Sequence, residues 1–193
     1  MIGYRVSAYD TPCPPSPSRR TGRWGVAAGE VVNYWSMHPY AAWAELYRFD
    51  GIDEGSVRSI SQRLWIGRFD HVDVVDLTGP DAADWGLRPD DLVDDDWSAC
   101  HLAAERLTTA GVSAIRAPSA ALPGADNLVL FGQRIAIEFD AVVDDPEIEI
   151  PCVVAADATC GVPDALRGMR RRSEPWTARQ GVDQLLPTPL PLY

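Results

Sequence analysis

Three residues that could bind a ligand and act on it lie close together, between positions 23 and 45. Arg23, Tyr34 and Glu45 follow one another at two intervals of eleven residues. Arginine offers a planar fork of donors that suits phosphate, and an aromatic face attracts a flat or cationic ring. A carboxylate stabilises developing positive charge. The three together suit a ligand with a phosphate, a flat ring and a sugar between them. The alternative for Glu45 is an exposed helical glutamate paired with Arg48.

A fourth candidate lies much further along the chain. Ser119 follows Pro118 in a short loop between two apolar stretches. A hydroxyl at such a place can face a ligand site. The alternative is a turn serine that bonds its own backbone, which is common for this residue type.

These candidates need secondary-structure elements to position them, and the pattern of apolar residues predicts those elements. Strands are predicted over 4–10 and 29–36, within 57–69 and 71–78, and on both sides of the 118–125 loop. Helices are predicted over 39–49, with Pro39 in the first turn, and over 97–111, with Gly111 as the C-terminal cap. The proline-rich stretch 11–22 is either a lid or a plain connection. The acidic stretch 81–97 is predicted to be a solvated loop, since it lacks the spacing of a calcium-binding loop.

Composition excludes several classes of protein. A formal net charge of −11 argues against nucleic-acid binding, which needs a basic face. All 17 basic residues are arginines, so no lysine is present for Schiff-base chemistry. The four cysteines form no CxxC pair, which favours reduced thiols in the cytoplasm. No apolar run reaches the length of a membrane span, so we expect a soluble cytoplasmic protein without a membrane contact.

Two blocks of the sequence resemble the RES domain family, toxins of bacterial toxin–antitoxin pairs. The first block has a Gly-Arg-Trp start and ends in Ala-x-x-Glu, and its residues here are Gly22, Arg23, Trp24, Gly29, Tyr34, Ser36, Pro39, Ala42 and Glu45. The second is Pro118-Ser119-Ala120 with Asn127 and the apolar run behind it. The family is named for its Arg, Glu and Ser, which correspond to Arg23, Glu45 and Ser119. The sequence departs from the family at Gly25, where an Asn is usual, and beyond Phe139.

The resemblance implies an α+β fold with an ADP-ribosyltransferase-like mixed β core and flanking helices. That core should span residues 1–140. Residues 141–193 would form a C-terminal extension, which carries large apolar residues and should pack on the core, on a partner or on a second copy in a homo-oligomer.

The resemblance also implies that NAD is the substrate, that no metal is required, and that an antitoxin with a helix-turn-helix domain is the partner. The expected reaction is cleavage of the nicotinamide–ribose bond by phosphorolysis or hydrolysis. Transfer of ADP-ribose to a protein and a non-catalytic interaction module are the alternatives. The expected substrate-binding residues are Arg23, Trp24, Tyr34, Ser36, Ser119 and Asn127, and the expected catalytic residues are Arg23, Tyr34, Glu45 and Ser119.

Arg23 would bind the pyrophosphate and Tyr34 would stack on the nicotinamide. Glu45 would stabilise the positive charge that develops on the ribose carbon. Ser119 would donate a hydrogen bond to the riboside or to an incoming phosphate.

Overall fold

The computed structural model describes residues 1–7, 22–25, 32–49, 63–69 and 72–132 of the chain. They form a six-stranded sheet with the strand order β3-β1-β2-β6-β5-β4. Its strands are β1 (Ile2–Ser7), β2 (Val32–Ser36), β3 (Arg63–Arg68), β4 (Val74–Asp76), β5 (Ala114–Pro118) and β6 (Asp126–Phe131). All neighbouring strands are antiparallel except β4 and β5, which are parallel. The predicted α+β class with a mixed β core is confirmed.

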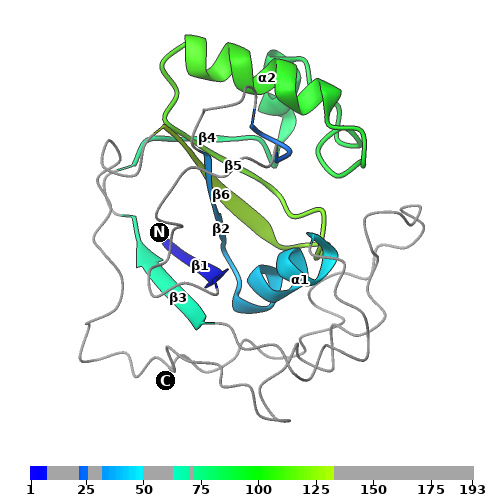
Figure 1. Cartoon of the computed structure of the whole chain (residues 1–193). Helices are drawn as coiled ribbons and strands as arrows, with labels where there is room; N and C mark the ends of the chain where they lie inside the picture. Colours follow the sequence, from blue (N-terminus) through cyan, green and yellow to red (C-terminus); the bar gives the residue numbers. More distant parts are fainter. Residues whose placement is uncertain (8–21, 26–31, 50–62, 70–71, 133–193) are drawn as a thin grey trace.

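Helices occupy the places that the sequence predicts. Helix α1 spans Pro39–Phe49, and Nδ1 of His38 accepts a hydrogen bond from the backbone N–H of Tyr40 at its start. Helix α2 spans Ser98–Thr109 and is followed by Gly111, whose φ of 81° is left-handed and suits glycine. A 3-10 helix, η2 (Pro80–Trp85), precedes α2. The two form the connection between β4 and β5 and lie together at the top of Figure 1.

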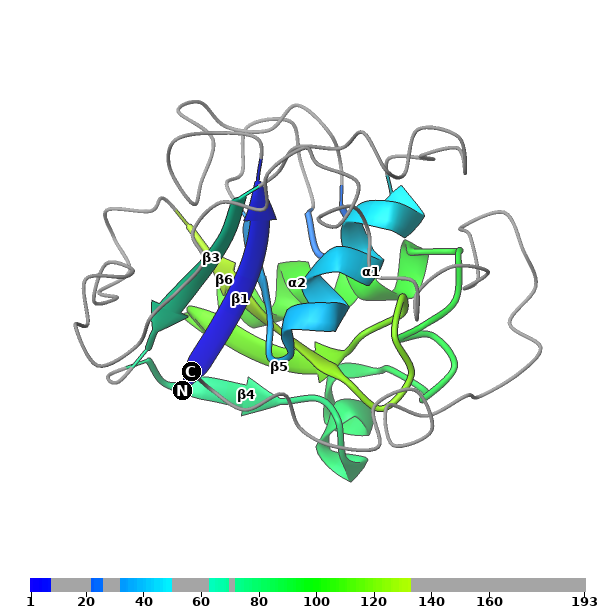
Figure 2. The same ribbon diagram turned by 90° about the horizontal axis from the view of Figure 1, so that it is seen from below.

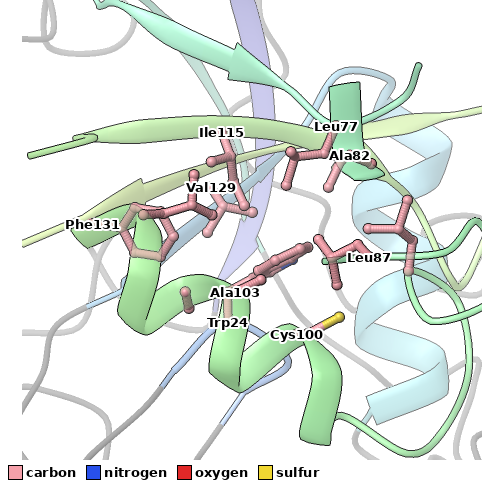
Figure 3. Close-up of a cluster of buried hydrophobic side chains, with 13 residues drawn as sticks. Trp24, Leu77, Ala82, Leu87, Cys100, Ala103, Ile115, Val129 and Phe131 are labelled. Atoms are coloured by element: carbon pink, nitrogen blue, oxygen red, sulfur yellow. The ribbon is translucent and has the colours of Figure 1, made fainter. Parts of the chain in front are cut away.

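The larger part of the core lies between the sheet and α2 (Figure 3). Strands β5 and β6 contribute Ile115, Val129 and Phe131, which point toward the helix. Helix α2 contributes one apolar face, with Cys100, Ala103, Ala104 and Leu107 all buried. This apolar stripe recurs at helical spacing and is the reason that α2 covers the sheet.

A smaller cluster lies on the other face of the sheet and includes the alternate residues of β5 and β6. It consists of the buried residues Trp35, Phe69, Ala114, Leu128 and Leu130. Gly3 and Gly67 are paired across β1 and β3, and a Cβ at either would lie within 3.0 Å of Phe69 and within 3.0 Å of Trp35. The two glycines therefore make room for the largest side chains of this cluster.

The acidic stretch 81–97 is not simply a solvated loop, and that prediction is wrong in part. Its exposed carboxylates do face water, but Ala82, Leu87 and Leu92 are buried in the core with α2. Asp95 forms an ion pair with Arg48 of α1. The signal in the sequence was an apolar residue at every fifth position, which the density of aspartates obscured.

Several predicted segments lie outside the described residues. They include the 11–21 part of the proline-rich loop, the start of the 29–36 strand and the whole 141–193 extension. Among the residues that are described, no helix has the length and apolar character needed to cross a membrane. Helix α1 runs beside β1 and β2, as Figure 2 shows, and so stands next to the strand that carries Tyr34.

Candidate active site

The short turn from Gly22 to Gly25 holds Arg23, and three hydrogen bonds fix it. The N–H of Gly25 donates to the carbonyl of Gly22 at 3.1 Å. The N–H of Trp24 donates to the hydroxyl oxygen of Tyr34 on β2 at 3.0 Å. Nε2 of His101 on α2 lies 3.0 Å from the carbonyl oxygen of Gly22, so this nitrogen carries the proton. The turn is therefore tied to both the sheet and α2.

The Arg23 guanidinium is directed into the space between that turn and the 90–97 segment. Its Nη1 donates a hydrogen bond to the carbonyl of Asp91 at 3.4 Å, and the guanidinium carbon lies 5.8 Å from the centre of the Trp97 ring. Burial lowers the pKa of Arg23, while the nearby Cys100 thiol and the Glu45 carboxylate act in the opposite direction. The Coulombic effect of Glu45 indicates that cation and carboxylate share one neighbourhood.

Tyr34 lies in the same neighbourhood. Burial raises the pKa of its hydroxyl, the hydrogen bond from Trp24 and the charge of Arg23 act to lower it, and the charge of Glu45 raises it further. The phenol is therefore neutral at physiological pH. The indole of Trp24, which we expected to contact a ligand, is 2% exposed and packs in the core beside α2 (Figure 3).

Glu45 comes from the middle of α1 and is held by two donors. Its Oε1 accepts a hydrogen bond from Ser119 Oγ at 2.7 Å and from Asn127 Nδ2 at 2.8 Å. The alternative of a surface pair with Arg48 is wrong, because Arg48 bonds Asp95 instead. Glu45 is thus turned toward the sheet.

Ser119 bonds both the backbone of its own turn and the carboxylate of Glu45. Its side chain is buried, and its Oγ accepts hydrogen bonds from the N–H groups of Ala121 and Leu122 at 3.2 and 3.1 Å. It is a turn serine in that respect. Its proton nevertheless goes to Glu45, since a hydroxyl has one proton and two lone pairs. The loop after β5 therefore presents a fixed donor to the carboxylate.

Two further residues of the predicted set belong to the same network. Ser36 and Asn127 lie directly opposite each other on β2 and β6. Ser36 Oγ donates to Oδ1 of Asn127 at 2.8 Å, and Asn127 donates to Glu45. Ser36, Glu45, Ser119 and Asn127 thus form one connected hydrogen-bond network.

Sequence reasoning missed the residues that brace this network. Arg48 is buried and donates to the carbonyl of Ala120 as well as to Asp95, which ties α1 to the Ser119 loop and to the 90–97 segment. Asp91 and Trp97 contact Arg23 from that same segment. No spacing connects Asp91 and Trp97 with residues 23–45, and the sequence pointed to Glu45 rather than Asp95 as the partner of Arg48. Within the described part of the chain, no three His, Cys, Asp or Glu side chains are grouped as metal ligands would be.

The family is decided by comparison with known proteins. The family model of the RES domain matches residues 4–153, which is most of the chain. The chain belongs to the RES domain family. The match passes the predicted domain boundary at 140, but 133–193 lie outside the described residues, so that division stays a prediction.

Two known proteins are similar to this RES domain. It is 35% identical over 120 residues to a probable NAD(+) phosphorylase of Mycobacterium tuberculosis, an alignment that covers 60% of this chain and 55% of that protein. The chain thus spans about half the length of this curated relative. A crystal structure of the M. tuberculosis MbcT–MbcA toxin–antitoxin complex contains a similar chain, with a TM-score of 0.60 and 22% identity. That likeness covers 74% of this chain and 82% of the other, and it shows the fold.

Proposed function

We propose that this RES domain cleaves NAD at the bond between nicotinamide and ribose and so depletes the NAD of its cell. The observation that carries the proposal is the Glu45 carboxylate, held by Ser119 and Asn127 in the electrostatic neighbourhood of the Arg23 guanidinium. The guanidinium can bind the pyrophosphate of NAD, and the carboxylate can stabilise positive charge on the adjoining ribose carbon.

The chemistry follows from the charges of NAD. When the bond between the ribose C1 and the ring nitrogen breaks, the electron pair leaves with nicotinamide, whose ring becomes neutral. Positive charge then develops on the ribose carbon and its ring oxygen, as in glycoside hydrolysis. A fixed carboxylate at Glu45 stabilises that charge more strongly than it stabilises the ground state.

Arg23 and Tyr34 bind the substrate in this proposal. Arginine has five N–H donors, and the contact from Arg23 Nη1 to the Asp91 carbonyl is long at 3.4 Å, so most of its fork can bond the pyrophosphate. The neutral Tyr34 ring attracts the cationic nicotinamide, an attraction that disappears when bond cleavage neutralises the ring. Tyr34 therefore also favours release of the product.

Phosphate is the acceptor that we propose first, because the curated relative is named a probable NAD(+) phosphorylase. An oxygen of phosphate forms the new bond to the ribose carbon, and the product is ADP-ribose 1″-phosphate. Water as the acceptor gives free ADP-ribose. A protein side chain as the acceptor would make the domain an ADP-ribosyltransferase.

We further propose that an antitoxin protein neutralises the enzyme by covering this site. The support is the similar chain that was crystallised in a toxin–antitoxin complex. A helix-turn-helix domain in that partner and a homo-oligomer formed through residues 141–193 remain predictions. So does a cytoplasmic location.

The test is product analysis with the purified chain. Mass spectrometry after incubation with NAD, with and without phosphate, should find nicotinamide together with ADP-ribose 1″-phosphate. Glu45→Gln keeps an acceptor oxygen but removes the charge, and should lower the rate by about 100-fold or more. Glu105→Gln is the matched control, since Glu105 is exposed on α2. NAD that stays intact, or a Glu45→Gln variant as active as the control, would refute the proposal. Label from NAD in acid-precipitable protein would favour transfer to a side chain.

A further inference from the structure

A series of side chains connects strands β2 and β6 of the sheet to Glu45 of α1. Ser36 and Asn127 face each other across β2 and β6. The side chains of such a pair lie on the same face of the sheet. Ser36 Oγ donates to Asn127 Oδ1, and Asn127 Nδ2 donates to Glu45 Oε1, each at 2.8 Å. Two strands and a helix are thus linked through one amide.

The chemistry of the partners fixes the orientation of that amide. An ionised carboxylate only accepts hydrogen bonds, so the Asn127 NH₂ group must face Glu45. The opposite orientation would bring Oδ1 against Oε1 at hydrogen-bond distance and create repulsion. The Ser36 hydroxyl donates to Oδ1 and thereby stabilises the favourable orientation. Ser36 does this although it makes no hydrogen bond to Glu45 itself among the described residues.

Both donors reach the same oxygen of Glu45. Ser119 and Asn127 bond Oε1, and among the described residues no hydrogen bond reaches Oε2. Two donors from different elements, the loop after β5 and strand β6, hold one oxygen and so fix the plane of the carboxylate. The two oxygens are therefore not equivalent.

We propose that Asn127 is a positioning residue that holds Glu45 through Oε1, that Ser36 fixes the Asn127 amide, and that Oε2 is the oxygen that faces the ribose carbon. This rests on the proposed NAD cleavage. It differs from the expectation that Ser36 and Asn127 touch the substrate. Substitution of a residue that acts only through Glu45 should lower the rate of the chemical step and leave the affinity for the substrate unchanged.

The experiment separates kcat from KM in four variants. Ser36→Ala should lower kcat about 10-fold, and Asn127→Asp, which turns a second carboxylate toward Glu45, about 100-fold, because small misplacements of a reacting group have effects of this size. KM should stay within about twofold of wild type, as expected when only transition-state stabilisation is lost. Ser36→Thr keeps the hydroxyl and should restore most of the rate. Ser113→Ala removes an exposed serine hydroxyl and is the matched control.

A second measurement does not depend on activity. In wild-type protein labelled with ¹⁵N, the side-chain amide of Asn127 should give a resonance typical of a proton bound to carboxylate. That resonance should move in Ser36→Ala and not in Ser113→Ala.

Three results would overturn the inference. They are a rise in KM at unchanged kcat in the Asn127 variant, a Ser36→Ala protein with wild-type kcat, and an Asn127 amide signal that ignores Ser36→Ala. A wild-type chain that leaves NAD intact would instead refute the proposed function, and the amide resonance alone would then decide whether Ser36 and Asn127 hold Glu45.

Discussion

Replacing Gly22 with alanine tests how the turn at Arg23 is held. An alanine Cβ at this position would lie 2.5 Å from the Tyr34 hydroxyl oxygen and 3.0 Å from the ring carbon that bears it. A Cβ atom essentially never lies closer than 3.0 Å to a nonbonded heavy atom of another part of the chain. The Tyr34 ring or the turn must therefore move by about half an ångström. Such a movement disrupts the 3.0 Å hydrogen bond from Trp24 N–H to that same oxygen.

The expected loss of stability follows from these contacts. Overpacking of this kind costs about 1–3 kcal/mol, and a buried N–H left without its acceptor costs about 1–3 kcal/mol. Movement of the Tyr34 ring relieves the overlap but breaks the hydrogen bond, so the two costs do not add in full. We expect a total of about 2 kcal/mol, which lowers the folded-to-unfolded ratio about 30-fold. Displacement of the adjacent Arg23 should also lower kcat/KM for NAD by about 10-fold.

Urea unfolding of four proteins and one control measures the effect. They are wild type, Gly22→Ala, Tyr34→Phe and the double variant, with Gly79→Ala as control because a Cβ at Gly79 meets nothing within 4 Å. Tyr34→Phe removes the hydroxyl oxygen that clashes. The loss in free energy of unfolding of the double variant should therefore be smaller than the sum of the two single losses by about 1 kcal/mol or more. The reasoning is refuted if the two changes add independently, or if Gly22→Ala unfolds at the same urea concentration as Gly79→Ala.

Two further predictions concern the elements around the site. Arg48→Met should destabilise the protein by about 2–4 kcal/mol, because it removes a buried cation that pairs with Asp95 and donates to a buried carbonyl. Arg88→Met, at a side chain that is 82% exposed, should leave the midpoint of the same urea titration unchanged. Hydrogen bonds from the Ser98 side chain and backbone hold the pKa of Asp96 below its usual value of 3.8, so the unfolded chain binds more protons. This contribution is full above that usual pKa and is lost as the pH falls through the lower folded value; stability measured from about pH 5 to pH 2 should therefore fall less steeply in Asp96→Asn, and equal slopes would contradict the assignment.

Local patterns in the sequence were sufficient for α1 and α2 and for the strands beside the site, but not for η2. Pro39 with alternating apolar residues before it predicted the boundary between β2 and α1, and both bounds agree with the structure. Gly111 predicted the end of α2, where it has the left-handed backbone that a cap requires. The resemblance to the RES family selected Glu45 and Ser119, because residue type alone left an exposed helical glutamate and a turn serine as alternatives.

Tertiary structure alone decided how these residues work together. The hydrogen bond from Asn127 to Glu45 joins residues that are 82 positions apart in the sequence, and the ion pair of Arg48 with Asp95 joins residues that are 47 apart. Neither follows from helical or strand periodicity, which relates only positions a few residues apart. The sequence by itself predicted the candidate site residues and the elements on which they lie. The register of β2 against β6 and the packing of the 90–97 segment on α1 decided which oxygen of Glu45 is held and what holds Arg23, because those contacts join residues that are neighbours only after the chain has folded.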